Sequence, residues 1–228
     1  MKPAQTQPDH PTRRRIFVLD DHPITRYGLI QLINEQPDLI VCGEAENSQE
    51  ALAALKLAQP ALVLADITLP GESGLDFIKN LQMQYPSVPA LVLSMHDESV
   101  YAERVLRAGG RGYIMKSAGG ERLLESIRQV LDGRIYLSAS MSAAILDAFS
   151  RRRSVTTEAR PGALSDREFE VFQLLGQGLS TREIGQRLHL STKTIGTHRF
   201  HMRQKLRLGT GSELIREAVR WAATQQLV

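Results

Sequence analysis

The sequence predicts a parallel α/β domain followed by a smaller, all-helical domain, and three features of the chain lead to this fold class. Between residues 16 and 132, five short apolar runs alternate with five longer amphipathic segments, which is the pattern of a βα repeat. Residues 164–224 show apolar residues at helical spacing only. Between these parts, the stretch 151–163 combines arginines and small polar residues with Pro161 and Gly162, which is linker composition.

The elements of the first domain follow in order along the chain. The runs expected to form strands are residues 16–19, 39–42, 61–65, 90–94 and 112–115. The segments expected to form helices are about residues 23–36, 48–59, 74–85, 98–108 and 119–132. Because the third and fourth runs are continuously apolar, helices should cover both faces of the sheet. Right-handed crossovers then favour a five-stranded parallel sheet in the flavodoxin-like order 2-1-3-4-5.

Single residues predict two details of these helices. The apolar residues that helical spacing places on one inward face of the first helix are Ile24, Leu29, Leu32 and Ile33. Ser48 is a candidate N-cap of the second helix, because its hydroxyl can accept a hydrogen bond from an unpaired amide of the first turn.

Helix-start signals divide the second domain into four short helices. The residues with capping-box spacing at the first two helix starts are Ser165 with Glu168 and Ser180 with Glu183. Ser191 can cap a third helix over about residues 192–207, and a fourth helix is expected over about residues 212–224. The short turn between the second and third helices predicts a helix-turn-helix.

The charge distribution follows the same division. Up to Ser150 the chain has 14 Lys and Arg against 18 Asp and Glu, a net charge of −4, and the rest has 14 against 7, a net charge of +7. A basic domain is compatible with a phosphate backbone as partner, although composition alone fits a solvated basic surface equally well. The expected divisions are a disordered tail over 1–15, an α/β domain over 16–132, a linker over 133–163 that can form a short helix at 140–149, and a helical domain over 164–228.

Composition argues against several classes of protein. With 42% hydrophobic and 23% charged residues, the chain has the composition of a soluble globular protein. No apolar run approaches the ~20 residues of a membrane helix, so no membrane partner is expected. The polar N-terminal tail lacks the apolar stretch of a secretory signal, and Cys42, the only cysteine, allows no intrachain disulfide. These features favour a cytoplasmic protein.

Polar residues stand where four of the expected strands end. They are Asp20 and Asp21 after the first strand, Asp66 after the third, Ser94 at the end of the fourth and Lys116 after the fifth. In a parallel sheet these ends meet at one edge. Three carboxylates there would repel one another without a cation, and oxygen ligands suit Mg²⁺. One Asp after a strand is more often only a helix cap or turn former, but five such residues at one edge predict a reactive site.

This set of groups is suited to phosphoryl transfer onto a carboxylate. An aspartate can act as a covalent nucleophile and form an aspartyl phosphate. The transfer mainly requires positioning and charge neutralisation, which Lys116 and Mg²⁺ can supply at the phosphoryl oxygens. The hydroxyl of Ser94 can donate a hydrogen bond to one of these oxygens.

The third helix of the second domain has two distinct faces. The residues expected to pack inward are Ile195, His198, Met202 and Leu206. The residues on the opposite side are Lys193, Thr197, Phe200, Gln204 and Arg207, with Arg199, Arg203 and Lys205 on the flanks. Such a polar, basic helix suits the major groove of DNA, with its flanks near phosphates. The alternative is a solvated face without a ligand. His198 is expected to be a packing residue, and Phe200 fits either a thymine methyl or a neighbouring side chain.

Residues 16–132 resemble a response-regulator receiver domain. The resemblance rests on Asp20-Asp21, the run from Asp66 to Gly74, Ser94, and the run from Tyr113 to Lys116. It implies that Asp66 is the phosphoacceptor and that Mg²⁺ is held by Asp20, Asp21, Asp66 and the backbone carbonyl of Thr68. It also implies that Ser94 and Tyr113 form a switch pair, in which the hydroxyl moves to the phosphate beside Lys116 and the ring turns inward.

Residues 164–224 resemble the LuxR-type DNA-binding domain. The matching residues are Leu164-Ser165, Arg167-Glu168, Gly178-Leu179-Ser180, Glu183-Ile184, Leu188, Ser191, Lys193-Thr194-Ile195, His198 and Lys205-Leu206. The residues expected to contact DNA, from the faces of the third helix together with this resemblance, are Lys193, Thr194, Thr197, Arg199, Phe200, Arg203, Gln204 and Lys205. One departure is Gly196, where many relatives have a basic residue. This glycine removes a contact and weakens the helix by roughly 1 kcal/mol relative to Ala.

Together the two resemblances imply a two-component response regulator of the NarL/LuxR type and not an enzyme. A sensor histidine kinase or a small phosphodonor would phosphorylate Asp66, and the surface over about residues 98–118 would change. That change would free the recognition helix or promote a homodimer on double-stranded DNA. The residues of the last helix that offer a dimer surface, unless they pack inside their own domain, are Leu214, Ile215, Ala218 and Val219. RNA polymerase is a further expected partner.

Two other functions fit part of the sequence. A phosphatase of the haloacid-dehalogenase type also forms an aspartyl phosphate, but it has a second Asp two residues after the nucleophile, where this chain has Thr68. That function would also leave the basic domain without a role. The second alternative is a constitutive DNA-binding protein whose first domain only docks a partner. Sensitivity of DNA binding to Asp66→Asn would separate this alternative from the main hypothesis.

Overall fold

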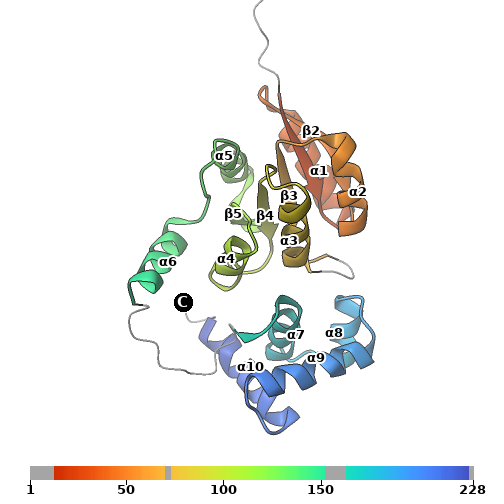
Figure 1. The fold of residues 1–228 in the computed structure, drawn as a ribbon, viewed down its shortest axis with the longest axis vertical. Helices are drawn as coiled ribbons and strands as arrows, with labels where there is room; N and C mark the ends of the chain where they lie inside the picture. The colour runs from red at the N-terminus through yellow and green to blue at the C-terminus, as the bar shows by residue number, and fades with distance from the viewer. Residues whose placement is uncertain (1–12, 70–72, 152–162, 226–228) are drawn as a thin grey trace, which may run out of the picture.

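The computed structural model describes residues 13–69, 73–151 and 163–225 (Figure 1). Its sheet has five parallel strands in the order β2-β1-β3-β4-β5, as the sequence predicts. The strands are β1 (Arg14–Leu19), β2 (Leu39–Ala45), β3 (Leu62–Asp66), β4 (Ala90–Ser94) and β5 (Gly112–Met115). Because every neighbouring pair is parallel, the carboxyl ends of all five strands lie at one edge of the sheet.

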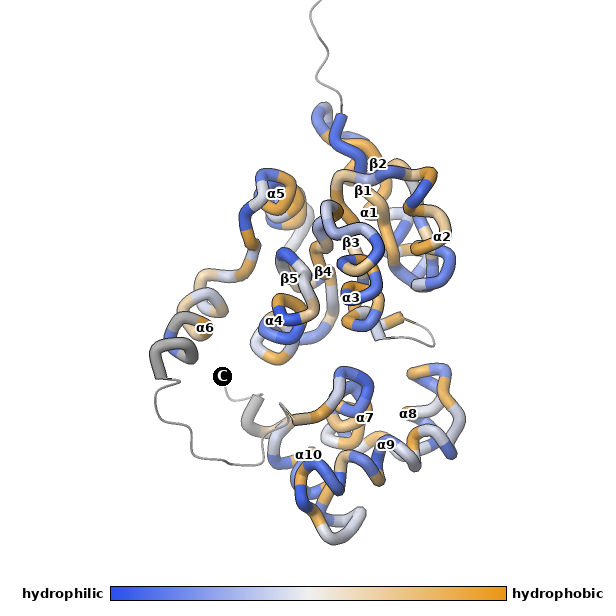
Figure 2. The backbone as a smooth tube through the Cα atoms, in the orientation of Figure 1, coloured by the Kyte–Doolittle hydropathy of each residue, from blue (hydrophilic) through white to orange (hydrophobic). Residues whose placement is uncertain are grey.

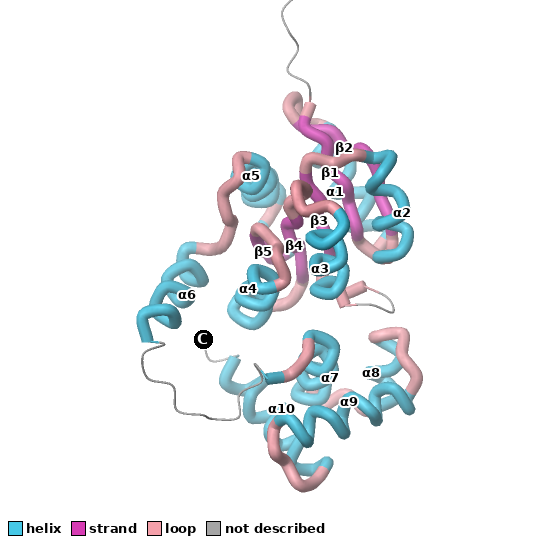
Figure 3. Tube along the Cα trace, viewed as in Figure 1, coloured by secondary structure: helices cyan, strands magenta, loops and turns pink. Residues whose placement is uncertain are grey.

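Helices cover both faces of this sheet, so the strands contribute to two apolar layers (Figure 3). One layer includes Phe17 and Leu19, and the other includes Ile16 and Val18; all four side chains are fully buried. Figure 2 shows the contrast between apolar strands and helices with hydrophilic stretches. The helices are α1 (Pro23–Asn34) and α5 (Gly120–Leu131) on one face, and α2 (Ser48–Ala58), α3 (Gly74–Gln84) and α4 (Glu98–Arg107) on the other.

The C-terminal part is a bundle of four short helices. They are α7 (Asp166–Gly176), α8 (Thr181–Arg187), α9 (Thr192–Lys205) and α10 (Gly211–Gln225). Ser165 and Ser180 form the two predicted capping boxes, and Ser191 caps α9 through the amide of Thr194. A further helix, α6 (Ala139–Arg151), lies in the stretch expected to be a linker. Within the described ranges, no helix is long and apolar enough to cross a membrane.

Two local expectations were wrong. Ile24 does not face the sheet, since its side chain is 89% exposed, whereas Leu29 and Ile33 further along α1 are buried. The first turn of α1 therefore projects beyond the core, and periodicity cannot show where a sheet ends. The N-cap of α2 is Asn47, whose side chain accepts a hydrogen bond from the amide of Glu50, and Ser48 is the first helical residue.

The first strand also differs from its expected boundary. β1 begins at Arg14, two residues before the expected start, because the Arg14 amide donates to the carbonyl of Asp38 at 2.8 Å and the strand pairs with β2 from there. Most of the expected tail (1–12) and the C-terminal third of the expected linker (152–162) lie outside the described residues.

The two domains meet through α3 and α4 on one side and α7 on the other (Figure 1). At the centre, the Ser73 hydroxyl donates to Glu170 Oε1 at 2.7 Å, and the Tyr101 hydroxyl donates to Gln173 Oε1. All four residues are buried. Since a buried polar group is costly unless it is hydrogen-bonded, these paired side chains hold one particular arrangement of the domains.

Charged and aromatic groups extend this contact at its edge. Arg104 of α4 forms an ion pair with Asp166 at 2.9 Å, and its guanidinium lies 4.0 Å from the centre of the Phe169 ring. Lys79 of α3 reaches the same Asp166 at 2.6 Å. The contact thus runs through α7, and Figure 1 shows α9 on the far side of α7 from the sheet.

Candidate functional site

The carboxyl edge of the sheet brings two aspartates and a lysine into direct contact. Asp66 is the last residue of β3, and Lys116 begins a 3₁₀ turn directly after β5. Lys116 Nζ donates to Asp66 Oδ2 at 2.6 Å and to Asp20 Oδ2 at 2.7 Å. The side chains of Asp20 and Asp66 are only 2% and 5% exposed. The structure thus brings together three of the residues that the sequence singled out, as a buried group of charges.

The environment of Asp66 favours a reactive but oriented carboxylate. Its Oδ1 accepts a hydrogen bond from the Thr68 amide at 3.0 Å. Burial raises the pKa of Asp66, against the opposing attraction of Lys116. Burial by itself would lower the pKa of Lys116, but the attraction of Asp66 and Asp20 outweighs it and raises this pKa. Lys116 therefore stays cationic and can neutralise negative charge that is brought to Asp66.

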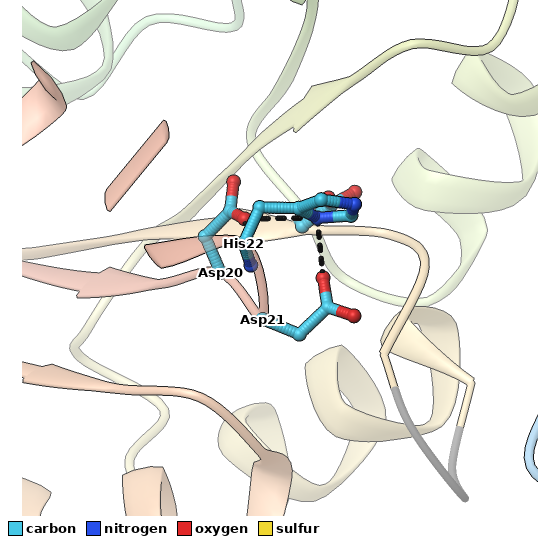
Figure 4. A group of neighbouring side chains, drawn as sticks. Asp20, Asp21 and His22 are labelled. Carbon is cyan, nitrogen blue, oxygen red and sulfur yellow. Dashed lines mark hydrogen bonds and ion pairs between the residues drawn. The ribbon is translucent and has the colours of Figure 1, made fainter. Parts of the chain in front are cut away.

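The same edge carries a group of donor atoms that fits a divalent cation (Figure 4). One ligand atom from each of Asp20, Asp21, His22 and Asp66 lies within 4.8 Å of the others. Asp21 Oδ1 is buried and lies 2.7 Å from His22 Nδ1. A donor set dominated by carboxylates fits Mg²⁺. The three aspartates were predicted from the strand ends, whereas His22 was not, because its only signal is its place directly after the pair.

The two expected switch residues lie close to this pocket and share His96 as a partner. Ser94, the last residue of β4, is fully buried, and its Oγ accepts a hydrogen bond from the His96 amide at 3.1 Å. The Tyr113 hydroxyl donates to the His96 carbonyl at 2.8 Å, and its ring is also fully buried. The Tyr113 ring thus lies inward in this structure, in the position that the resemblance assigns to it in the switch pair.

A continuous series of contacts leads from Asp66 to the domain boundary. Thr68, held to Asp66 through its amide, places its Oγ1 3.2 Å from His96 Nε2. The His96 ring lies 5.2 Å from the Tyr101 ring, centre to centre, and Tyr101 donates to Gln173 of α7. Burial lowers the pKa of His96, so its imidazole is neutral at pH 7. Sequence reasoning missed His96, Tyr101 and Gln173, because contacts between distant residues leave no local pattern.

The recognition helix α9 has the two faces that its sequence predicts. Ile195 and Met202 are fully buried, and His198 is half-buried with its pKa lowered by burial. The residues on its exposed face are Lys193, Thr197, Phe200 and Gln204. Phe200 is 54% exposed, and its ring lies 5.8 Å from the His201 ring, centre to centre. This face offers hydrogen-bonding groups, one cation and one aromatic ring to a ligand.

The flanking residues of α9 already have partners inside the domain. Arg199 donates to Thr181 Oγ1 at 2.7 Å, and Arg203 donates to the carbonyl of Gly209. Lys205 Nζ lies 2.6 Å from a carboxylate oxygen of Glu168. The Thr194 hydroxyl is 2.8 Å from that of the capping Ser191. These four side chains therefore help to hold α9 in place, and a phosphate would share them with the domain.

The residues expected to form a dimer surface on α10 divide into two pairs. Leu214 and Ala218 are fully buried and pack inside their own domain. Ile215 and Val219 are 39% and 45% exposed on the outer side. Only the second pair is available to another chain in this structure.

Comparison with known protein families covers both parts of the chain. Residues 16–128 match the response regulator receiver domain. Residues 162–218 match the family of bacterial regulatory proteins named after LuxR. Among curated proteins, the oxygen regulatory protein NreC of Staphylococcus carnosus is 32% identical over 210 residues, which is 90% of this chain and 97% of that protein. NreC of Staphylococcus aureus strain RF122 is 33% identical over the same length.

Solved structures with a similar fold come from the same group of proteins. A LuxR-family two-component response regulator from Aurantimonas is 31% identical with a TM-score of 0.57, and the match covers 61% of this chain and 100% of that one. RcsB of Salmonella typhimurium is 23% identical with a TM-score of 0.64, covering 91% of this chain and 98% of that one. At that identity, RcsB supports the fold alone.

Proposed function

We propose that Asp66 is the residue that accepts the phosphoryl group in this chain, which belongs to the two-component response regulators of the NarL/LuxR type. In this type a receiver domain is joined to a LuxR-type DNA-binding domain, and the chain is a phosphorylation-controlled transcription regulator. The observation that carries the assignment is the contact of Lys116 with the buried Asp66 and Asp20 at the carboxyl edge of the sheet.

The proposed step transfers a phosphoryl group from a sensor histidine kinase, or from a small phosphodonor, to a carboxylate oxygen of Asp66. The bond between phosphorus and the donor atom breaks as the new phosphorus–oxygen bond forms. Lys116 stays cationic and stabilises the added negative charge, and the hydroxyl of Ser94 turns from the His96 amide to a phosphoryl oxygen. Asp20, Asp21, Asp66 and the carbonyl of Thr68 would hold Mg²⁺, which when bound neutralises charge on the transferred group.

The test is the intact mass of the protein after incubation with acetyl phosphate and Mg²⁺, with Asp66→Ala as the matched control. One added phosphoryl group that is absent from the control supports the assignment. An adduct that persists in Asp66→Ala would place the phosphoacceptor elsewhere.

We also propose that phosphorylation reaches the second domain through His96 and Tyr101. When the Ser94 hydroxyl leaves the His96 amide, the ring of His96 shifts against the ring of Tyr101. This shift weakens the hydrogen bond from the Tyr101 hydroxyl to Gln173. Trp221, the only tryptophan, packs against Phe169 and Phe172 and lines the cleft between the domains. Phosphorylation should therefore shift its fluorescence to the red in the wild type and not in Asp66→Ala. An unchanged spectrum after complete phosphorylation would contradict this route.

The DNA contacts proposed for α9 come from its exposed face, with Lys193, Thr197, Phe200 and Gln204 in the major groove. The flanking Thr194, Arg199, Arg203 and Lys205 would meet phosphates while keeping their contacts inside the domain. Ile215 and Val219 are the proposed contact of a homodimer on paired half-sites. A regulator that binds bacterial chromosomal DNA would act in the cytoplasm and would there also meet RNA polymerase.

A further inference from the structure

We propose that Phe200 recognises the methyl group of a thymine and thereby makes a T·A base pair the preferred one at one position of each half-site. The inference rests on the proposed placement of α9 in the major groove, and it names what the centre of the exposed face recognises. Hydrogen-bonding side chains of that face make the other base contacts, whereas Phe200 supplies an apolar one.

Phe200 lies on the exposed face of α9, between Thr197 and Gln204. It is 54% exposed, and no other Phe, Tyr or Trp is exposed in the described part of the second domain. Single exposed apolar side chains are common on protein surfaces, but this one stands on the face that is proposed to meet base edges. The C5-methyl group of thymine is the apolar group that a base presents in the major groove. An exposed phenyl ring on this face therefore matches thymine.

The helical turn before Phe200 leaves space beside this ring. On a helix, a side chain lies over the turn that precedes it, next to the residue four positions earlier. For Phe200 that residue is Gly196, which is exposed, and an added Cβ there would meet nothing within 4 Å. The absent side chain at Gly196 lets a base approach the helix backbone beside the ring.

Thr197 adds a second apolar group on the same face. Its Oγ1 donates to the carbonyl of Lys193 at 3.2 Å, one turn earlier in α9. Because the backbone of α9 already engages this hydroxyl, the methyl group is the part of the exposed Thr197 side chain that remains for contact. Threonine methyl groups and phenylalanine rings both make apolar contacts with thymine methyl groups. The two neighbouring side chains and the space at Gly196 together form a small apolar surface.

The Phe200 ring has a neighbour that limits its movement without covering it. The His201 ring lies 5.8 Å away, centre to centre, with an angle of 61° between the two ring planes. Such an edge-on arrangement is favourable between aromatic rings. Phe200 still has more than half of its surface exposed beside this neighbour, so the ring is oriented in advance and remains available to a base.

The expected effect is that of one methyl group. Burial of a single methyl group changes affinity by about fourfold. Uracil pairs with adenine as thymine does but lacks the methyl group, so replacing one thymine by uracil removes this contact alone. 5-Methylcytosine carries the same methyl group on a C·G pair, so at the same position it should bind more tightly than cytosine.

The test uses the full chain phosphorylated with acetyl phosphate and Mg²⁺, and the duplex that it enriches from a random-sequence library. Each thymine of one half-site is replaced in turn by uracil, and fluorescence anisotropy gives the Kd of each duplex. At one thymine the replacement should weaken binding of the wild type by about fourfold and leave binding of Phe200→Ala unchanged. Phe200→Leu, which keeps an apolar side chain, should retain part of this sensitivity.

Gln204→Ala is the matched control, because Gln204 lies on the same exposed face one turn after Phe200. This variant should bind the thymine and uracil duplexes more weakly by the same factor, and so keep the ratio of the wild type. A loss of sensitivity to uracil in Phe200→Ala but not in Gln204→Ala assigns the methyl contact to Phe200.

Two results would overturn the inference, and they differ in what else they affect. If uracil changes the binding of the wild type and of Phe200→Ala by the same factor at every position, Phe200 recognises no methyl group, and the weaker binding of Gln204→Ala still supports α9 as the reading helix. If no sequence is enriched, or if Phe200→Ala and Gln204→Ala both bind as tightly as the wild type, the proposed role of α9 fails together with the inference.

Discussion

The pocket around Asp66 and the recognition helix α9 hold their functional groups in opposite environments. In the pocket, Asp20 and Asp66 are almost fully buried and share one lysine. On the outer face of α9, the candidate DNA contacts Lys193, Thr197, Phe200 and Gln204 are exposed. Burial strengthens electrostatic interactions and makes each partner depend on the others. Single changes in the pocket should therefore have large effects, and single changes on the exposed face should have small ones.

The largest effect is expected at Lys116. Lys116→Met removes the cation that contacts Asp66 and Asp20, and loss of one such group usually costs about 10²–10³ in rate. The rate of phosphoryl incorporation from acetyl phosphate, followed by intact mass, should fall by that factor. Lys56→Met, at an exposed lysine of α2, is the matched control. A rate within about threefold of the control would show that burial does not make this residue critical.

Substitutions on the inner face of α9 should have large effects, as in the pocket, but on the stability of the fold and not on the rate of phosphorylation. Ile195 is fully buried, and truncating such a side chain costs about 2–5 kcal/mol. Thr197→Ala, two residues along on the exposed face, should change stability by less than about 0.5 kcal/mol. Urea unfolding monitored by Trp221 measures both, since Trp221 packs in this domain against Phe172. Equal losses for the two variants would remove the distinction between the faces.

Each single substitution on the outer face of α9 should weaken DNA binding by only a small factor. Lys193→Ala removes one exposed cation, so binding to a random-sequence duplex should weaken by roughly fivefold, and the slope of log affinity against log salt should fall by about 1. Fluorescence anisotropy at several salt concentrations measures both quantities, with Lys56→Ala as the control. An unchanged affinity and slope would mean that the charge of Lys193 does not lie close to the DNA.

Alanine substitutions at two glycines of the second domain should change its stability by smaller amounts and in opposite directions. A Cβ at Gly196 of α9 would meet nothing within 4 Å, so Gly196→Ala should stabilise the domain by about 0.5–1 kcal/mol. A Cβ at Gly176 of α7 would lie 2.5 Å from the carbonyl oxygen of Ala218, so Gly176→Ala should destabilise it. Urea unfolding followed at Trp221 compares the two variants, and stabilisation by both would contradict the packing of α7 on α10.

The smallest effect is expected at an exposed ion pair. Arg128 donates two hydrogen bonds to Asp38, both at 2.8 Å, and holds the pKa of Asp38 below its ordinary value. Both side chains are more than 40% exposed, so Asp38→Asn should cost less than about 1 kcal/mol. A carboxyl group with a lowered folded pKa stabilises the fold above its ordinary pKa, and this contribution is lost as pH falls through the folded value. The difference in Tm between variant and wild type should therefore shrink with acidification, and a constant difference would contradict the ion pair.

Local sequence predicted the elements and the reactive edge because both depend on short-range patterns. Strands, helix caps at Ser165 and Ser180, and the meeting of Asp66 with Lys116 follow from periodicity and from the parallel order of strands. The domain contact did not follow, because Ser73 and Glu170 are 97 residues apart and carry no shared signal. The inward ring of Tyr113 depends on side-chain packing, which periodicity does not determine.

The central claim is that phosphorylation of Asp66 changes DNA binding, and one measurement tests it most directly. The wild type and Asp66→Ala, each treated with acetyl phosphate and Mg²⁺ or left untreated, would be equilibrated with a library of duplexes that have a random central sequence. We expect treated wild type alone to retain more DNA and to enrich a paired, inverted sequence. Equal retention by treated wild type and treated Asp66→Ala, after intact mass has shown phosphorylation of the wild type, would contradict the claim.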